Sequence, residues 1–435
     1  MSNAPVAARR VVSLSLALAA VSAGVARAQT YESLPVDKTL ARKAALIKRD
    51  IRNPSGDPGA KQELEAYFDR YFFPAMTQHT DKALEKLGGS RIDLFKGFLW
   101  VASGDTYRTV YGKATRFAVG VLRSDKFHPA VRYNALLILG MLDSQPAGAD
   151  GTPPTPDERA NGMMCQLVGR AMKSASRPRY ELVGSLIGLE RHTRFFDQLS
   201  AKAQQRTSDA MVQLLVAKEL AGEYQRGVRP WVYTLAAQSL GNTGKAGPRG
   251  QRFRAIARRL GDDTLGTTSR SRLAAQLQRL DTEGVTIDAS EAVQAIRTLA
   301  AEIGRRESKL ATQFEDLRLG GRGGRVRAGQ PTVQTRNKTA HRFRPTENGY
   351  QLVRPGLVDL LTDLRAGVRA VGRVAAAADR ESLAEIDAAV NAALMAASNE
   401  DEGDLKVADA IKSMAGRIDA VVDPAAAEAE DFAAR

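Results

Sequence analysis

The sequence predicts an all-α fold in which pairs of helices stack on one another and are followed by a C-terminal helical segment. Three observations lead to this prediction. Apolar residues recur with helical spacing along most of the 435 residues. Alternating strand patterns are nearly absent before residue 330. A block rich in Pro, Val, Ala, Leu and Gly recurs at matching offsets, which is typical of repeat proteins.

The first 28 residues have the three parts of an export signal. Arg9 and Arg10 give the positive start, residues 11–23 form an apolar run, and residues 26–28 (Ala-Arg-Ala) fit a cleavage pattern. This signal is typical of bacteria, so we expect cleavage after Ala28 and a periplasmic or secreted protein. An uncleaved anchor is the alternative, but a membrane span needs roughly 20 apolar residues. No later stretch approaches that length, so we expect no transmembrane span in the mature chain.

Composition permits a packed interior, with 43% hydrophobic and 26% charged residues. One cysteine, Cys165, excludes an intramolecular disulfide framework and a cysteine-cluster metal site. Its apolar neighbours indicate a buried, inert thiol. Lys and Arg total 63 against 49 acidic residues, and the net charge of +14 favours acidic partners.

Residues 29–103 are expected to form an N-terminal helical segment. One apolar face there follows the spacing i, i+3, i+4, i+7, i+8 and is largely aromatic: Leu64, Tyr67, Phe68, Tyr71 and Phe72. We interpret this face as core packing rather than as a ligand-stacking site. Further helices are expected over residues 38–50, 80–87 and 92–102.

An internal repeat is expected within residues 104–250. Residues 128–140 (HPAVRYNALLILG) align without gaps with residues 229–241 (RPWVYTLAAQSLG), and residues 177–189 form a looser copy. Proline suits the first turn of a helix, and we expect the final glycine to adopt the left-handed conformation of a C-cap. Each copy follows another expected helix, over residues 107–122, 162–173 and 209–224.

These three blocks resemble the second helix of HEAT repeats, which places Pro, Val-Arg, Ala and Leu-Gly at such spacings. Residues 128–140 match best and include Val131-Arg132. The resemblance covers about a third of the chain, and the period exceeds the family's usual ~40–47 residues. It implies an α-solenoid that binds partners along a concave face and implies no catalysis. An irregular helical bundle with chance similarity is the alternative.

The chain becomes strongly basic after the repeat. Residues 251–317 are expected to be a helical extension, with Arg252, Arg254, Arg258 and Arg259 on one basic helix face and helices over 267–280 and 290–317. Residues 318–354 hold nine Lys or Arg and one acidic residue, and we expect a Gly/Arg-rich loop with one short hairpin. Five arginines of this loop are the candidate anion-binding residues: Arg322, Arg325, Arg327, Arg342 and Arg344.

The sign of the charge reverses in residues 355–435, which carry 16 acidic and eight basic side chains. We expect an antiparallel helix pair over 357–378 and 382–397, a further helix over 405–422, and a tail. An acidic end that screens the basic body is a sufficient explanation for this asymmetry.

No catalytic, cofactor or metal signature is present in the sequence. Residues 241–245 (Gly-Asn-Thr-Gly-Lys) lack the spacing of a phosphate loop, and a surface or capping position is expected for His192. The sequence therefore predicts an exported, non-enzymatic protein-binding scaffold. The alternative is an envelope protein that binds an anionic polymer through residues 318–354, although a solvated linker without a partner would explain that segment as well. An exported protein rarely meets nucleic acid, so we do not expect a nucleic-acid partner. An enzyme with an unrecognised site is the third hypothesis.

Overall fold

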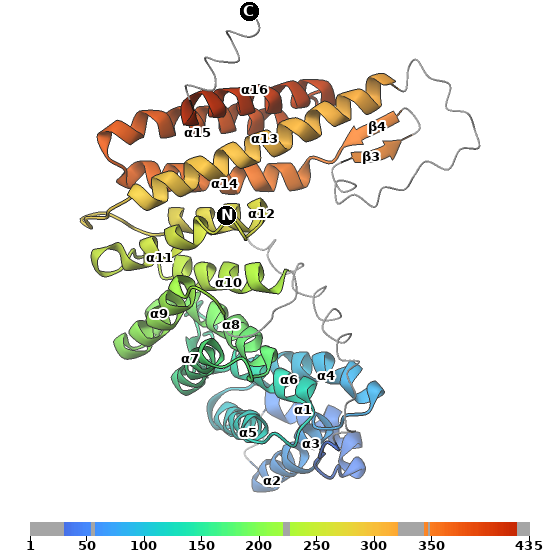
Figure 1. Ribbon diagram of the computed structural model, residues 1–435. Helices are drawn as coiled ribbons and strands as arrows, with labels where there is room; N and C mark the ends of the chain where they lie inside the picture. Colours follow the sequence, from blue (N-terminus) through green and yellow to red (C-terminus); the bar gives the residue numbers. More distant parts are fainter. Residues whose placement is uncertain (1–29, 54–56, 221–226, 321–342, 347–348, 424–435) are drawn as a thin grey trace, which may run out of the picture.

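The computed structural model describes residues 30–53, 57–220, 227–320, 343–346 and 349–423. Within these ranges the fold is all-α, as predicted, with two short antiparallel strand pairs (Figure 1). The expected export signal, the C-terminal tail after residue 423 and most of the basic loop lie outside the described residues.

The N-terminal segment is built around aromatic side chains. Its helical elements are η3 (Lys38–Lys43), α1 (Ala44–Arg52), α2 (Pro58–Tyr67), η4 (Phe68–Phe72), α3 (Phe73–Ala75), α4 (Asp81–Asp93), η5 (Leu94–Phe98) and η6 (Leu99–Val101). The π-helical elements η4 and η5 bring Phe68 and Phe72 against Phe98, with ring centroids 5.1 and 5.2 Å apart. The aromatic face predicted from the sequence is therefore core packing.

Four helix pairs follow the N-terminal segment. The first helices of the pairs are α5 (Gly104–Arg123), α7 (Glu158–Lys173), α9 (Ala201–Val216) and α11 (Gln251–Leu260). The second helices are α6 (Pro129–Leu139), α8 (Arg179–Thr193), α10 (Val228–Asn242) and α12 (Thr267–Gln278). The second helices pack in the order α6, α8, α10, α12, and α7, α9 and α11 pack in a parallel row (Figure 1). Successive pairs therefore form layers of one stack.

The C-terminal part is a bundle that continues the stack. It contains α13 (Ser290–Gly320), α14 (Pro355–Val374), α15 (Ala377–Ser398) and α16 (Asp404–Val422). Helix α14 packs against α12, α13 packs against α16, and α15 packs between α14 and α16. The three helices from residue 355 onward lie close to the predicted ranges. Strands β3 (Phe343–Thr346) and β4 (Gly349–Leu352) pair as the short hairpin expected in the basic loop.

A second strand pair and two single turns complete the described elements. Strands β1 (Asp143–Gln145) and β2 (Thr155–Pro156) pair within the connection between α6 and α7. The 3-10 turns are η7 (Phe196–Gln198) and η8 (Pro248–Gly250).

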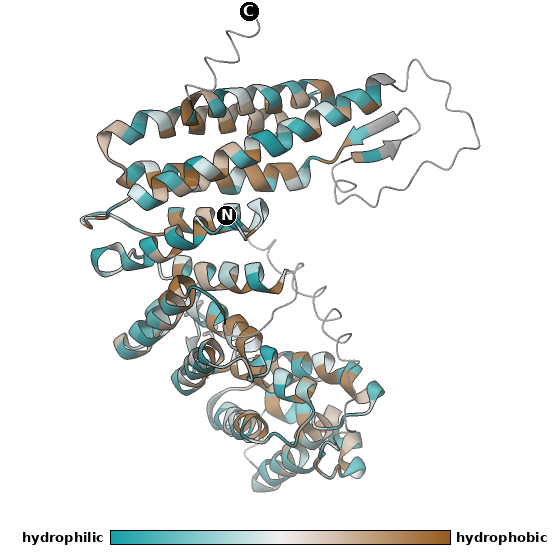
Figure 2. Ribbon diagram, in the orientation of Figure 1, coloured by the Kyte–Doolittle hydropathy of each residue, from teal (hydrophilic) through white to brown (hydrophobic). Residues whose placement is uncertain are grey.

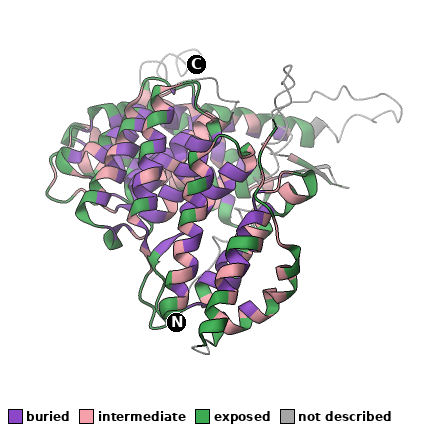
Figure 3. Ribbon diagram, turned by 90° about the horizontal axis from the view of Figure 1, so that it is seen from below, coloured by how far each residue is buried: buried purple, intermediate pink, exposed green. Residues whose placement is uncertain are grey.

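Apolar side chains fill the space between the layers. In Figure 2 the hydrophobic residues gather on the helix sides that face other helices, and Figure 3 shows the buried residues between the helices. One core runs continuously from Met164 in α7 to Ile418 in α16, and a second core joins the N-terminal segment to α5 and α6. The last three helix pairs of the stack and the C-terminal bundle therefore share one core.

Glycines hold the second helices at close approach. A Cβ added to Gly140, which follows α6, would lie 2.4 Å from the Cα of Gly188 in α8. A Cβ on Gly367 of α14 would lie 2.4 Å from Cβ of Ala274 in α12. Gly140 has φ −66°, so the left-handed cap predicted for this glycine is wrong. Glycine is required there because the neighbouring backbone leaves no room for a side chain.

Buried arginines donate hydrogen bonds to carbonyl oxygens at the C-terminal ends of two first helices. Arg132 of α6 donates to the carbonyl oxygen of Leu122 at the end of α5, and Arg270 of α12 donates to that of Leu260 at the end of α11. In each case the arginine follows the carbonyl by ten residues in the chain. Because the last carbonyls of a helix have no intrahelical donor, these arginines satisfy groups that burial would otherwise leave unpaired.

Two features of the predicted repeat differ from the structure. The helix expected over residues 209–224 is α9, which begins at Ala201 and ends at Val216. Ser200 caps its start, and an amphipathic pattern alone did not reveal that capped turn. The repeated prolines also drift in register: Pro129 is the first residue of α6, Pro178 precedes α8, and Pro230 is the third residue of α10.

We predict that Gly188→Ala destabilises the protein by about 1–3 kcal/mol, the usual cost of overpacking a helix contact. The new Cβ would lie 2.3 Å from Sδ of Met164 and 2.7 Å from the Cα of Gly140. Urea unfolding followed by circular dichroism measures this change.

Gly169→Ala is the matched control for this substitution. Gly169 lies in α7 and has open space around its Cα, so alanine should leave stability unchanged or raise it by up to about 1 kcal/mol. Equal stability of the two variants would contradict the close approach of α6 and α8.

Candidate functional site

One of the five predicted anion-binding arginines lies within the described residues, so the arrangement of the five stays a prediction. Arg344 lies on β3 and is exposed. The other four, Arg322, Arg325, Arg327 and Arg342, lie outside the described residues.

Asp404 fixes both sides of the basic loop to the C-terminal bundle. Its carboxylate accepts hydrogen bonds from the backbone N–H of Leu352 at 3.0 Å and from the Arg354 guanidinium at 2.6 Å. Arg318, which lies before the loop, approaches the same carboxylate at 4.0 Å. The Phe343 ring stacks on Phe314 with centroids 5.8 Å apart. Two of the nine basic residues of the loop segment therefore serve an internal anchor.

The exposed side of the second helices α6, α8, α10 and α12 forms a continuous surface, which we call the second-helix face. Its apolar side chains are half-buried: Tyr133 and Leu137 on α6, Ile187 on α8, and Trp231 and Leu235 on α10. Tyr133, Trp231 and Leu235 pack partly on the core, whereas Leu137 and Ile187 do not belong to the core clusters. The face therefore presents apolar groups that internal packing does not use.

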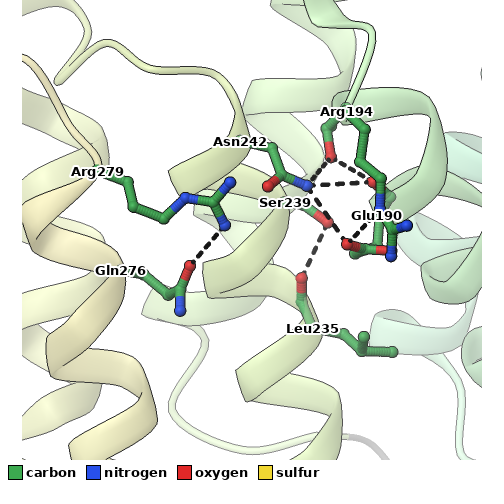
Figure 4. Close-up of polar contacts among 8 residues, drawn as sticks. Glu190, Arg194, Leu235, Ser239, Asn242, Gln276 and Arg279 are labelled. Atoms are coloured by element: carbon green, nitrogen blue, oxygen red, sulfur yellow. Dashed lines mark hydrogen bonds and ion pairs between the residues drawn. The ribbon is translucent and has the colours of Figure 1, made fainter. Parts of the chain in front are cut away.

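The polar part of the second-helix face lies at the C-terminal ends of the same helices (Figure 4). Asn242 of α10 donates to the backbone oxygen of Glu190 at 3.3 Å and to the Thr193 hydroxyl at 3.2 Å, both in α8. The Arg194 guanidinium binds the Glu190 carboxylate with two hydrogen bonds, of 3.0 and 2.9 Å. The Asn242 contacts join adjacent layers, and the Arg194 pair holds the Glu190 carboxylate within its own layer.

Two arginines of α12 give this face an excess of positive charge. Arg272 and Arg279 are exposed, and neither has a carboxylate within ion-pair distance among the described residues. Arg279 donates to the amide oxygen of Gln276, at 3.3 Å (Figure 4). Nearby on α14, burial raises the pKa of Asp363 to about 6, and Arg272 opposes that rise. The α12 end of the face is therefore suited to an acidic group.

The four arginines expected on one basic face of α11 separate into two pairs. Arg252 and Arg259 are buried and lie over the rings of Phe196 and Tyr233, at 5.5 and 4.0 Å from the centroids. Arg254 and Arg258 are exposed on the opposite side of the helix. The prediction was wrong because Arg252 and Arg259, seven residues apart, share one face of α11. Arg254 and Arg258 lie on the opposite face of the same helix.

His192 and Cys165 are both enclosed by the stack. His192 is fully buried rather than at the surface, and burial lowers its pKa to about 3. The periodic pattern of α8 could not reveal this because almost every side of that helix contacts a neighbour. Cys165 is buried as predicted, and burial raises the pKa of its thiol, which disfavours the reactive thiolate.

Two further kinds of site are absent from the described part of the chain. No three His, Cys, Asp or Glu side chains in these residues gather as potential metal ligands. No described helix is both long enough and apolar enough to cross a membrane.

No family model, no curated protein and no solved structure matches the chain.

We predict that Asp404→Asn loosens the anchor of the basic loop. Loss of the carboxylate charge weakens the charge-assisted bonds to Arg354 and to the N–H of Leu352. Chymotrypsin should then cleave after Phe343 or Leu352 several-fold faster than in the unchanged protein, as measured by mass spectrometry of timed digests. Asp401→Asn in the same α15–α16 connection is the control, and equal cleavage of both variants would contradict the anchor.

We also predict a pH dependence that comes from His192. Below pH 6.5 the unfolded chain protonates this histidine, whereas the folded protein keeps it neutral until the pH nears 3. Its contribution to the unfolding free energy should therefore fall by about 1 kcal/mol between pH 6.5 and 5.5. Urea unfolding of the unchanged protein and of His192→Phe at both pH values measures the difference. Identical pH dependence in the two proteins would refute the prediction.

Proposed function

We propose that the chain is an exported, non-enzymatic protein-binding scaffold and that the second-helix face is its binding surface. Export rests on the signal pattern of residues 1–28. The resemblance to HEAT repeats favours the same proposal, because proteins of that family bind partners along stacked helices.

The continuity of the second-helix face is the observation that supports this function most directly. Helices α6, α8, α10 and α12 lie side by side on one side of the stack (Figure 1). Aromatic and arginine side chains are enriched in the buried centres of protein interfaces, and both types are present here in Tyr133, Trp231, Arg272 and Arg279. The bonds among Glu190, Arg194 and Asn242 reduce the side-chain entropy that a binding event would cost.

The chemistry of the face indicates the kind of partner segment. Leu137, Ile187 and Leu235 suit apolar side chains, and Arg272 and Arg279 suit carboxylates at one end. We infer a protein segment that combines apolar residues with an acidic end. Electrostatic complementarity of this kind would orient the segment along the stack.

The alternative function, binding of an anionic envelope polymer, depends on a different part of the chain. It would use Arg344 and the other arginines of the loop segment 318–354. Such binding would fall steeply with salt, because counterions are released when a polyanion is neutralised.

Affinity capture with matched variants tests the proposed function. The bait is the mature chain, residues 29–435, and the source is an extract of the bacterial envelope at moderate salt. In the face variant, Ile187→Ser is combined with Arg279→Gln. In the control variant, Met395→Ser is combined with Arg258→Gln, which removes an exposed apolar group and an exposed arginine elsewhere.

The proposal predicts that the unchanged chain and the control variant retain the same discrete protein. The face variant should retain at least tenfold less of it. Equal retention by all three baits would refute the second-helix face as the binding surface. Loss of binding on deletion of residues 321–342, or with rising salt, would favour the polyanion function instead.

A further inference from the structure

A cleft of about 740 Å³ opens at one edge of the stack, between two successive helix-pair turns. The turn that joins α5 to α6 supplies one wall with Phe127, and the turn that joins α7 to α8 supplies the other with Ser174 and Ser176. Tyr31 and Tyr180 add aromatic surface. We call this space the turn cleft. It lies at the N-terminal ends of α6 and α8.

The ion pairs of the turn cleft leave part of its positive charge unmatched. Arg132 is nearly fully buried and is matched by two carboxylates, Asp125 at 2.9 Å and Glu181 at 3.5 Å. Arg177 reaches Glu181 only at 4.0 Å. Arg170 and Lys173 also line the cleft, are exposed, and have no carboxylate within ion-pair distance among the described residues. The two carboxylates are thus engaged mainly by Arg132, while Arg170 and Lys173 at the rim have no ion pair among the described residues and Arg177 has only the 4.0 Å contact.

Burial strengthens the interactions that the interior of the turn cleft can make. Glu181 is 2% exposed, and burial raises the pKa of its carboxyl, which the neighbouring arginines Arg177 and Arg132 oppose. The Arg132 guanidinium lies over the Tyr180 ring, 5.6 Å from its centroid. These contacts hold the floor of the cleft rigid, so a ligand at the rim would meet a preorganised site.

The size and walls of the turn cleft favour a peptide over a small ion. A free phosphate or acetate would occupy a small part of 740 Å³ and would leave the aromatic walls uncovered. A peptide could place carboxylates against Arg170, Lys173 and Arg177 and an aromatic or apolar side chain between Tyr31 and Phe127. Arginine binds carboxylates with two parallel hydrogen bonds, which adds orientation to charge attraction.

We propose that the turn cleft binds an acidic peptide segment that carries an aromatic residue among its carboxylates. This site goes beyond the proposed function, because its cationic residues belong to α7 and the α7–α8 turn and not to the second-helix face. A chain could therefore possess the turn cleft as a binding site even if the second-helix face bound nothing.

Fluorescence anisotropy with defined probes tests the turn cleft. The first probe is a labelled eight-residue peptide of six glutamates around two central phenylalanines. The second is the same peptide with glutamine in place of glutamate, and the third is inorganic phosphate as a competitor. The protein is the mature chain, residues 29–435, measured at low and at physiological salt.

Two triple variants remove three positive charges each. The cleft variant is Arg170→Gln, Lys173→Gln and Arg177→Gln. The control variant is Lys202→Gln, Arg254→Gln and Arg258→Gln, whose side chains are exposed on α9 and α11. Circular dichroism of both variants verifies that the fold is retained.

The proposal predicts that the acidic peptide binds to the unchanged protein. The Kd of this peptide should be at least tenfold higher for the cleft variant and should change less than twofold for the control variant. Three outcomes would overturn it: equal weakening in both variants, equal binding of the glutamine peptide, or no binding of the acidic peptide. Displacement of the peptide by millimolar phosphate would overturn the peptide assignment in favour of a small-anion site.

Discussion

The close packing of the second helices is the constraint on which the rest of the structure depends. Where α6 meets α8 and where α12 meets α14, the helices approach so closely that a Cβ would not fit at Gly140, Gly188 or Gly367. Close approach maximises the contact between layers and excludes voids. It also aligns the exposed sides of successive helices, so the continuity of the second-helix face is a consequence of the same packing.

The sequence predicted the helical class but assigned the wrong role to one glycine of its repeat blocks. The sequence predicts a left-handed cap for the glycine that ends two of the three repeat blocks, but one of these glycines, Gly140, has helical φ and contacts Gly188 across the layers. A single sequence shows that a glycine recurs, but not which neighbour approaches it. His192 illustrates the same limit, because its burial is decided by helices distant in the chain.

The candidate site was harder to predict than the fold, because net charge does not show where charge is exposed. Arg132, Arg252, Arg259 and Arg270 are buried and bind helix-end carbonyls, aromatic rings or carboxylates. The surface is accordingly less basic than the net charge of +14 indicates. The cationic rim of the turn cleft combines residues from α7 and the turn after it, and no sequence motif marks this combination. Arg270 follows Leu260 by the same ten residues that separate Arg132 from Leu122, and this shared spacing relates α12 to α6.

Hydrogen exchange measured by mass spectrometry on Gly188→Ala tests most directly whether the second helices form one stack. If the layers support each other through close contacts, exchange should accelerate in α6 and α10 as well as in α8, because α8 packs against both. Distant α15 should keep its protection. Acceleration confined to α8 would contradict the account, since it would show that the neighbouring second helices do not depend on that contact.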